Sequence, residues 1–326
     1  MQMLLPRRAA AAVATLAIAI ATPALAQDWP VKPIRIVVTF APGGSSDVVA
    51  RAIAIPLQAK LGQPVVVENK PGAGGSIGAG DVARAAPDGY TLLMSNTTPI
   101  SLAPAMLDPA PYDPIKSFAH VSLVATVPDV VMVHPSVPVK TVPELVTWIK
   151  AKGETINFGS GGIGSIGHIL GETFKKEQGL NIEHIGYRGS APMILDLIGG
   201  RLSFSFDTLP QNVPHIRSEK LRPLAVTSRQ RHALMPDLPT VLEVGMPNLV
   251  AENFIGIAAP AGIAAPIQQK LHAAIQASLT HDAFKARLAE LGLTVQPMSQ
   301  PDFQAFVEAQ IKSWAPAVKA SGAKLN

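Results

Sequence analysis

The chain of 326 residues contains no cysteine, only 5% aromatic residues and only 15% charged residues. Without cysteine it can form no disulfide bond and offers no cysteine for a lipid anchor. Its core must therefore be stabilised by burying apolar side chains, and a hydrophobic content of 48% supplies enough of them. The 27 basic and 23 acidic residues are nearly balanced and scattered along the chain. This balance argues against binding to nucleic acid or to an anionic membrane surface.

A pronounced apolar run occurs at the N-terminus. Arg7 and Arg8 precede an Ala/Val/Leu/Ile stretch over residues 9–21, and residues 24–26 read Ala-Leu-Ala. A basic start, a short apolar core and an A-x-A site are typical of a secretory signal peptide. The run is shorter than the roughly 20 apolar residues that span a bilayer. We therefore predict that residues 1–26 are removed on export and that the mature chain diffuses freely in the periplasm. An ordinary export signal is favoured over a twin-arginine signal.

Strand-like and helix-like segments alternate along the mature chain, which is typical of parallel α/β sheets. In the first half, strands are predicted at residues 34–38, 65–68 and 90–94, and helices at 45–61 and 76–85. Further strands are predicted at 130–133, 156–158, 182–187, 202–206 and 224–227, and helices from Thr141, at 165–178 and at 191–198. The last third is predicted to be helical, at 266–279, 282–291 and 300–320, without strands of its own.

This order of segments predicts two α/β lobes. We expect lobe 1 to contain residues 27–126 and 254–326, because the helical tail should pack back on the first unit, and lobe 2 to contain 127–253. The chain would then cross between the lobes twice, near residues 124–128 and 253–259. Two such crossings form a hinge around which the lobes could close.

Three glycine-rich turns, at residues 42–47, 71–76 and 159–165, each follow a strand and open a helix. Glycine allows close approach of the backbone, and a helix N-terminus offers unpaired N–H groups and partial positive charge. Such a turn can hold a carboxylate without a lysine or arginine. The alternative is that turns between strands and helices are simply rich in glycine. Two turns facing each other across a cleft would favour anion binding.

Polar residues also end later strands. The turn at residues 187–192 contains Arg188, which could equally be a solvated surface residue, and Asp207 lies at the end of another strand. Open α/β sheets bind ligands at the carboxyl ends of their strands. Asp207 is therefore expected either to contact a ligand or to hold the amides of a loop.

Three enzyme or cofactor hypotheses carry less weight. Gly159-x-Gly161-x-x-Gly164 matches a dinucleotide fingerprint, but Glu183 falls in mid-strand, whereas the ribose-binding acid should close its strand. Residues 74–78 match the Gly-x-Ser-x-Gly pattern of a hydrolase with Ser76 as nucleophile. That pattern does not follow its strand directly, and no acid and histidine complete a triad. His168, one helical turn past Ser165, is expected to be a cap or wall residue. No ligand spacing predicts a metal site.

The stretch F-A-P-G-G-S-S-D-V-V-A-R (residues 40–51) resembles the first motif of the Bug receptors, the extracytoplasmic solute receptors of tripartite tricarboxylate transporters. Blocks similar to the later motifs of that family follow in the expected order at residues 67–75, 86–93, 112–114, 187–192, 224–228 and 258–262. The resemblance extends from Trp29 to the C-terminus. It departs from the family pattern at Thr39, Ser46, Arg188 and the segment 253–255, and the last of these puts the identity of the ligand in question.

The resemblance implies a two-lobed periplasmic binding protein fold of type II-like topology, with two mixed or parallel sheets flanked by helices. It implies a receptor without enzymatic activity, cofactor or metal, that is a monomer and passes a small organic carboxylate to membrane transporter subunits. The runner-up is an exported α/β hydrolase using Ser76. The ligand-binding residues implied in lobe 1 are Phe40, Gly43, Gly44, Ser45, Ser46, Asp47, Ser95 and Asn96. Those implied in lobe 2 are Gly161, Gly164, Ser165, Gly189, Ser190, Ala191 and Asp207.

Overall fold

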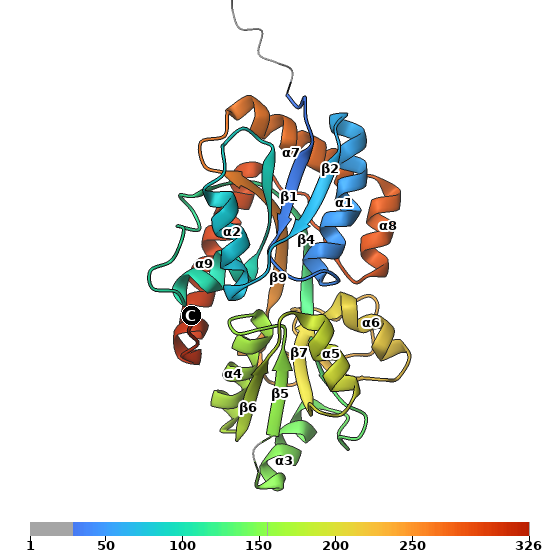
Figure 1. Cartoon of the computed structure of the whole chain (residues 1–326). Coiled ribbons are helices and arrows are strands. Elements are labelled where there is room, and N and C mark those ends of the chain that lie inside the picture. The colour runs from blue at the N-terminus through green and yellow to red at the C-terminus, as the bar shows by residue number, and fades with distance from the viewer. Residues whose placement is uncertain (1–28, 155, 326) are drawn as a thin grey trace, which may run out of the picture.

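The computed structural model describes residues 29–154 and 156–325, so the predicted signal peptide lies outside the described residues. The described chain forms two α/β lobes, one above the other in Figure 1. The strands are β1 Ile34–Val38, β2 Val65–Asn69, β3 Thr91–Asn96, β4 Phe118–Val133, β5 Ile156–Ser160, β6 Ile182–Gly186, β7 Phe204–Thr208, β8 Arg222–Val226, β9 Glu252–Pro260 and β10 Thr294–Val295. The helices are α1 Ser45–Leu61, α2 Ser76–Ala83, α3 Val142–Lys152, α4 Ile166–Gln178, α5 Ser190–Ile198, α6 Leu209–Arg217, α7 Ala265–Leu279, α8 Asp282–Glu290 and α9 Gln300–Ser321.

The sheet of lobe 1 is built on β1, whose β-branched residues are almost fully buried. β2 and β3 flank β1 in parallel, and β9 pairs with β3 in the antiparallel direction. Helix α1 packs its apolar face, including Val49, Ile53 and Leu57, on this sheet. Its apolar residues recur at helical spacing, which is why the predicted bounds of α1 agree with the structure. The glycine turn before α1 is thereby placed at the carboxyl end of β1.

The sheet of lobe 2 has the order β4-β7-β5-β6, with β8 also paired to β4. β5 runs parallel to both β6 and β7, whereas β7 and β8 run antiparallel to β4. Phe158, Phe174, Phe204 and Phe206 are fully buried and stack edge to face or in parallel within the core of this lobe. The fold is thus the predicted two-lobed α/β architecture with mixed sheets.

Two long strands, β4 and β9, carry the chain between the lobes. They pair antiparallel from Phe118 opposite Pro260 to Pro128 opposite Glu252. β4 continues into lobe 2, where it pairs with β7 and β8. The sequence predicted only residues 130–133 of this strand, because β4 is buried on both faces and lacks the alternation that marks a half-exposed strand.

The C-terminal tail departs from prediction in two respects. It contains a short strand, β10, which pairs with β4, so the expectation of a tail without strands is wrong. In addition, α9 packs on both lobes. Phe303 and Val307 join the core of lobe 1, whereas Trp314 and Val318 join the hydrophobic cluster of lobe 2. In Figure 1 the end of α9 accordingly lies beside α4.

Helix α6 was not predicted from the sequence. It contains Pro210 in its first turn and Pro214 further along, and proline within a segment argues against a helix. Pro210 fits the helix because it lies in the first turn, where no helical hydrogen bond is donated, whereas Pro214 lies inside the helix. No helix in the described part of the chain is long and apolar enough to span a membrane.

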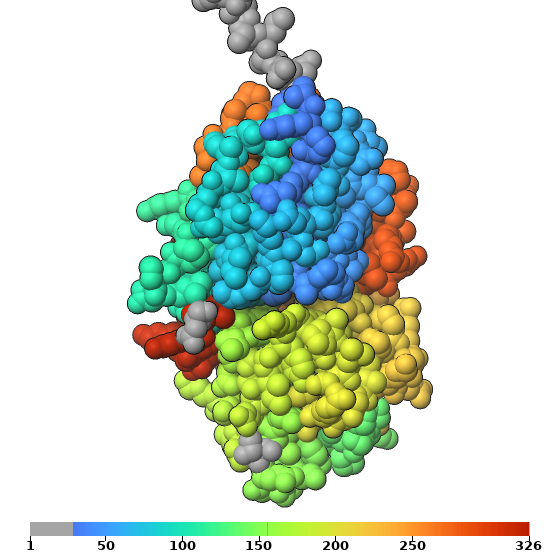
Figure 2. All heavy atoms as spheres, in the orientation of Figure 1, coloured from blue at the N-terminus to red at the C-terminus, as the bar shows by residue number. Residues whose placement is uncertain are grey.

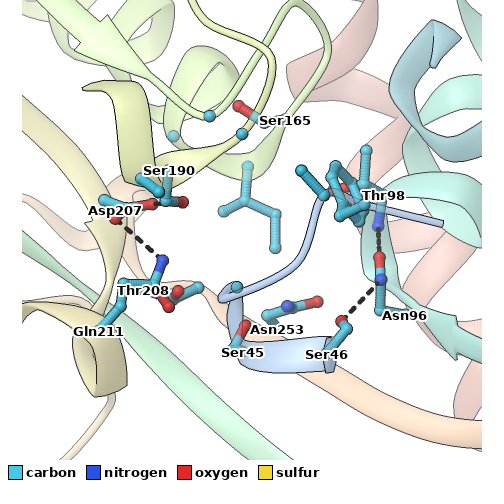
Figure 3. A pocket seen from close by; sticks show the side chains of 18 of the residues that line it. Ser45, Ser46, Asn96, Thr98, Ser165, Ser190, Asp207, Thr208, Gln211 and Asn253 are labelled. Atoms are coloured by element: carbon cyan, nitrogen blue, oxygen red, sulfur yellow. Dashed lines mark hydrogen bonds between the residues drawn. The ribbon is translucent and has the colours of Figure 1, made fainter. Parts of the chain in front are cut away.

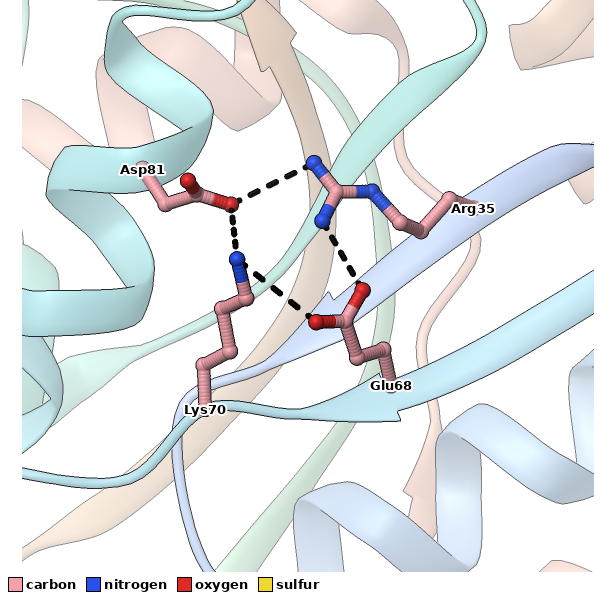
Figure 4. A network of polar contacts seen from close by, with 4 residues as sticks. All are labelled: Arg35, Glu68, Lys70 and Asp81. Carbon is pink, nitrogen blue, oxygen red and sulfur yellow. Dashed lines mark hydrogen bonds and ion pairs between the residues drawn. The ribbon is translucent and has the colours of Figure 1, made fainter.

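Four charged side chains form a network on lobe 1, shown in Figure 4. Arg35 of β1 pairs with Glu68 of β2 at 2.8 Å and with Asp81 of α2 at 3.3 Å. Lys70 pairs with the same two acids, at 3.5 Å and 2.8 Å respectively. The network joins β1, β2 and α2 and holds the end of β2, where Asn69 begins the contacts to the glycine turn described below.

Candidate functional site

A polar cavity lies between the two lobes and is lined by both. The space open to the centres of water molecules is about 80 Å³, room for several waters or one small organic molecule. On the face drawn in Figure 2, the atoms of the two lobes abut along a seam. The cavity is lined by Phe40, Ala41, Pro42, Gly44, Ser45, Ser46, Asn96, Thr98, Asp129, Gly161, Ser165, Ile166, Gly167, Gly189, Ser190, Ala191, Pro192, Asp207, Thr208, Gln211 and Asn253.

The N-terminus of α1 forms the wall contributed by lobe 1. Gly44 is the N-cap and has φ −77° and ψ 166°. The first helical hydrogen bond is donated by the Val48 N–H to the Gly44 carbonyl, which leaves the N–H groups of Ser45 and Ser46 without an intrahelical partner. Together with the partial positive charge of the helix end, these groups provide donors for an anion in the cavity.

Asp47 does not line this cavity, although the family resemblance implies a role in binding. Its carboxylate accepts a hydrogen bond from the Gly43 N–H at 3.0 Å and pairs with Arg51 and Asn69. Burial alone would raise the pKa of Asp47, but the hydrogen bonds from Arg51, Gly43 and Asn69 outweigh it and lower the pKa. The Asp47 carboxylate therefore holds the turn in place, and the Gly43 N–H is already hydrogen-bonded to it and not offered to a ligand.

Asn96 of β3 supports the same wall. Its side-chain N–H donates to the Ser46 hydroxyl at 3.0 Å, and its carbonyl oxygen accepts from the Thr98 N–H (Figure 3). The Ser46 hydroxyl proton is thereby left free for a ligand. Ser95 does not line the cavity, because successive residues of a strand point to opposite faces. Asn253 of β9 also lines the cavity, and its side-chain oxygen accepts from the Thr97 N–H.

On lobe 2, the turn at residues 159–165 opens α4. Ser165 is the N-cap, and its hydroxyl accepts from the His168 N–H. Gly164 does not line the cavity, since its N–H donates to His168 Nδ1 at 3.0 Å. The His168 ring stacks on His184 with centroids 3.8 Å apart, and His184 Nε2 contacts the Ser160 hydroxyl at 2.7 Å. Burial lowers the pKa of His168 to about 4, and burial together with His168 lowers that of His184 to about 3.

The second turn of lobe 2 brings Gly189 and Ser190 to the cavity at the start of α5. The Ser190 hydroxyl donates to Asp207 at 2.6 Å, and Gln211 and Asn212 donate to the other carboxylate oxygen at 3.0 Å and 2.8 Å. Asp207 therefore has a supporting role like the second alternative of the sequence analysis, since its carboxylate holds the Ser190 hydroxyl at the start of α5. It also lines the cavity, so direct contact with a ligand stays a prediction.

Asp129, a residue that the sequence analysis did not single out, is the second buried acid of the cavity. It lies in β4 opposite Thr208 and is only 2% exposed. Its backbone is fixed by Thr227, which accepts from the Asp129 N–H at 2.8 Å. Burial, and then the charge of Asp207, raise the pKa of Asp129 well above its ordinary value.

The structure brings most of the implied site residues to one cavity. Phe40, Gly44, Ser45, Ser46, Asn96, Gly161, Ser165, Gly189, Ser190, Ala191 and Asp207 line it, whereas Gly43, Asp47, Ser95 and Gly164 do not. Among the lining residues that were missed, Thr98, Asp129, Thr208, Gln211 and Asn253 are polar. Only Asn253 carried a signal, as part of a segment that departs from the family pattern.

The alternative chemistries find no support in the geometry. Ser76 is 2% exposed, and its hydroxyl lies 3.3 Å from that of Tyr112. It does not line the cavity, and no histidine is among its hydrogen-bond partners. The glycines of the dinucleotide fingerprint open α4 towards the cavity, while Glu183 lies inside β6. Among residues 29–154 and 156–325, no three His, Asp or Glu side chains cluster as metal ligands would.

Two α/β lobes joined by crossing strands around a polar cavity define a solute-binding protein of the periplasmic class. Residues 49–323 match the family model described as the tripartite tricarboxylate transporter family receptor. The chain is 37% identical to Protein BugT of Bordetella pertussis over 308 residues, which cover 94% of each chain. The chain belongs to this receptor family.

Solved structures show the same architecture. The periplasmic binding protein BugD is 36% identical with a TM-score of 0.85, over 91% of this chain and 99% of that one. The R. palustris protein Rpa4515 with adipate is 34% identical with a TM-score of 0.87, over 91% and 99%. MatC (Rpa3494) from Rhodopseudomonas palustris with bound malate is 30% identical with a TM-score of 0.84, over 89% and 99%. The predicted fold and family are thus confirmed.

Proposed function

We propose that the protein captures a small organic carboxylate in the periplasm and delivers it, as a monomer without enzymatic activity, to the membrane subunits of a tripartite tricarboxylate-type transporter. The ligand would be a di- or tricarboxylate, an aromatic acid or an acidic amino acid. The observation that carries this proposal is the cavity itself. Three helix N-termini, of α1, α4 and α5, line it from both lobes, and no lysine or arginine of the described residues does. Family membership and the adipate- and malate-bound neighbours support it.

The mechanism follows from donors on both lobes. A carboxylate that accepts from Ser45 and Ser46 of lobe 1 and from the turns of lobe 2 binds better when the lobes are closed than when they are open. Such a ligand shifts the population towards the closed form. The hinge would be formed by β4 and β9, the two strands that connect the lobes.

The test substitutes Gly44 by valine. The φ of −77° suits a β-branched residue, and a Cβ on Gly44 would meet only the Ala41 carbonyl oxygen at 3.8 Å. The fold should therefore persist, while the side chain occupies the space needed by a ligand. Losing two charge-assisted hydrogen bonds, at ~1.5–3 kcal/mol each, would weaken binding about a hundredfold or more.

Calorimetry with the acid identified by mass spectrometry of the gently purified protein measures this loss, and circular dichroism confirms folding. Ser76→Ala is the matched control, since Ser76 is buried outside the cavity and should leave affinity unchanged. A folded Gly44→Val protein that binds with wild-type affinity would remove the α1 turn from the site.

A further inference from the structure

One end of the cavity offers hydrogen-bond acceptors that have no partner in the protein. We call Asp129, Asp207 and Gln211 the acidic corner. Asp129 Oδ1 and Gln211 Oε1 are both buried and make no hydrogen bond within the described chain. The Gln211 amide is oriented by its N–H, which donates to Asp207, so its free atom is the oxygen. A buried polar atom without a partner is costly, and both residues line the cavity.

The opposite wall has the reverse polarity. Figure 3 shows Asp207 and Gln211 on one side of the cavity and Ser46, which is hydrogen-bonded to Asn96, on the other, with Ser45 between them. The α1 wall offers N–H groups at a helix end, whereas the acidic corner offers oxygens. Because the two walls differ in this way, they do not suit two identical ends of one ligand.

The charged surroundings of Asp129 are also defined. Of the strands paired with β4 at this point, β7 brings Asp207, and β9 brings Asn253, which is neutral. The Thr227 hydroxyl, just after β8, holds the Asp129 backbone. Glu252 of β9 lies opposite the neighbouring Pro128 and lines a separate groove near α9. Asp129 thus faces one acid and no base.

The two acids share their protons unequally. Asp207 accepts three side-chain hydrogen bonds, which favour its ionised form, although its burial raises its pKa. Asp129 accepts none from a side chain. Burial and the charge of Asp207 thus disfavour the ionised form of Asp129, which only a ligand of opposite charge would stabilise.

We propose that the acidic corner recognises a cationic nitrogen, so that the ligand is an amino acid-like zwitterion, with its carboxylate at the α1 N-terminus and its ammonium group between Asp129 and Gln211. An ammonium has three donors and no acceptor, which matches this set of oxygens. On binding, the Asp129 carboxyl loses its proton to solvent and becomes the counter-ion of the ammonium. This inference rests on the proposed function and narrows its ligand class.

A carboxylate or hydroxyl in place of the ammonium satisfies the corner less well. A second carboxylate could accept from protonated Asp129, but it would face the charge of Asp207 and leave Gln211 Oε1 without a donor. A hydroxyl could donate to only one of the two free oxygens.

Calorimetry on the mature protein with two matched ligand series tests this. Succinate, glutarate and adipate form one series, and aspartate, glutamate and 2-aminoadipate form the other. Repeating each titration at neutral pH in buffers of different ionisation enthalpy counts the protons released. We expect the amino member of the best-binding pair to bind at least about tenfold more tightly and to release protons on binding.

The Asp129→Asn variant keeps the shape of the side chain and removes its charge. It should lose the preference for the amino series and the proton release, while the plain acids bind at least as well as before. Glu252→Gln is the matched control, because this acid lies beside the same crossing but lines the other groove. The preference for the amino series and the proton release should both be unchanged in Glu252→Gln. Thermal unfolding checks that both variants are folded.

The outcomes separate this inference from the proposed function. If the plain acids bind as tightly as the amino acids or more tightly, the ligand is not a zwitterion and the protein remains a carboxylate receptor. The same conclusion follows if Asp129→Asn keeps the wild-type preference for the amino series. Failure of both series to bind, in a folded protein that retains no acid through purification, would overturn the proposed function together with this inference.

Discussion

The two walls of the cavity fix similar glycine turns at helix N-termini, but with different groups. In lobe 1 the turn before α1 is held by an ion pair, since Asp47 accepts from Gly43 and pairs with Arg51, whose side chain is 54% exposed. In lobe 2 the turn before α4 is held by neutral groups. Ser160 contacts His184, and His168 accepts from Gly164; Ser160, Gly164 and His168 are buried and His184 is partly buried.

The difference extends to packing. The α1 turn has open space around Gly43 and Gly44, where an added Cβ would meet little or nothing. At the start of α4, an added Cβ on Gly167 would lie 2.1 Å from the Phe206 carbonyl oxygen. The turn before α1 is thus loosely packed and held by an ion pair, whereas the turn before α4 is tightly packed and held by neutral groups. We expect the two walls to respond differently to added volume, lost hydrogen bonds, acid and salt.

Added volume should give the largest difference. Gly167→Ala forces α4 away from β7, because backbone cannot yield as a flexible side chain does, and should lower the free energy of unfolding by about 3 kcal/mol. Gly44→Ala should cost less than about 1 kcal/mol, since only its N-cap position is less favourable for alanine. Urea unfolding of both variants measures this. Equal losses would show that the two walls are packed alike.

Loss of a buried carboxylate should come next. Asp207→Ala leaves the Ser190 hydroxyl and the Asn212 amide without their acceptor, and we expect a loss of about 2 kcal/mol in unfolding free energy. Asp47→Ala should cost about 1 kcal/mol, because Arg51 can turn to water and the Asn69 amide still donates to the Phe40 carbonyl, which leaves the Gly43 amide without an acceptor. The same urea experiment compares the two variants. A larger loss for Asp47→Ala would mean that the ion pair is the stronger support.

These residues also show how far the sequence predicts this molecule. The bounds of α1 and β1 followed from helical spacing and a β-branched run, because both elements have one clear buried face. β4 was seen only at its end, since a strand buried on both faces has no alternating pattern. α6 was missed because proline argues against a helix, although Pro210 lies in the first turn, where no helical hydrogen bond is donated. The packing of α9 on both lobes depends on long-range geometry that no local pattern encodes.

The candidate site was predictable to a similar degree. Motifs marked the glycine turns, yet they could not distinguish a residue that lines the cavity from one that supports it, as with Asp47 and Gly164. Asp129 carried no signal, because its importance comes from the register of β4 beside β7, which places it near Asp207. Its role can be recognised only once the two strands are paired.

Acid should affect the wall of lobe 2 more than that of lobe 1. The pKa values of His168 and His184 are lowered to about 4 and about 3 in the folded protein, whereas histidine in an unfolded chain titrates at roughly 6.5. The unfolded chain therefore binds protons first, so this contribution to stability is complete above about pH 6.5 and declines as the pH falls towards about 4. Asp47, with its lowered pKa, remains ionised throughout this window.

Thermal unfolding between about pH 7 and 4.5 measures this decline, and His184→Gln should reduce its slope. His120 of lobe 1 is the matched control. Burial lowers its pKa to about 4 as well, but it lies away from the cavity. His120→Gln should therefore flatten the stability curve without changing how ligand affinity depends on pH. If His120→Gln and His184→Gln change the pH dependence of ligand affinity to the same extent, the effect of acid on binding does not arise from the α4 turn.

Salt should produce the smallest change in stability, and this change should arise in lobe 1. Arg35→Met removes the ion pairs to Glu68 and Asp81, whose side chains are 40% and 34% exposed. Pairs of this exposure contribute ~0.2–1 kcal/mol, and salt near 1 M, with a Debye length of about 3 Å, should screen most of that contribution. The loss caused by Arg35→Met, measured by urea unfolding at low salt, should therefore shrink at high salt.

Ser190→Ala is the counterpart in lobe 2, because it removes a part-buried hydrogen bond to Asp207 rather than an exposed ion pair. Its cost should be the same at low and high salt. The two responses together would show that exposed ion pairs support lobe 1, whereas a hydrogen bond within the cavity supports the α5 turn of lobe 2. Since the end of β2 places Asn69 against Asp47 and the Phe40 carbonyl, high salt should also loosen the α1 turn. If Arg35→Met lowers the free energy of unfolding as much at high salt as at low salt, the arginine acts through packing of its aliphatic stem.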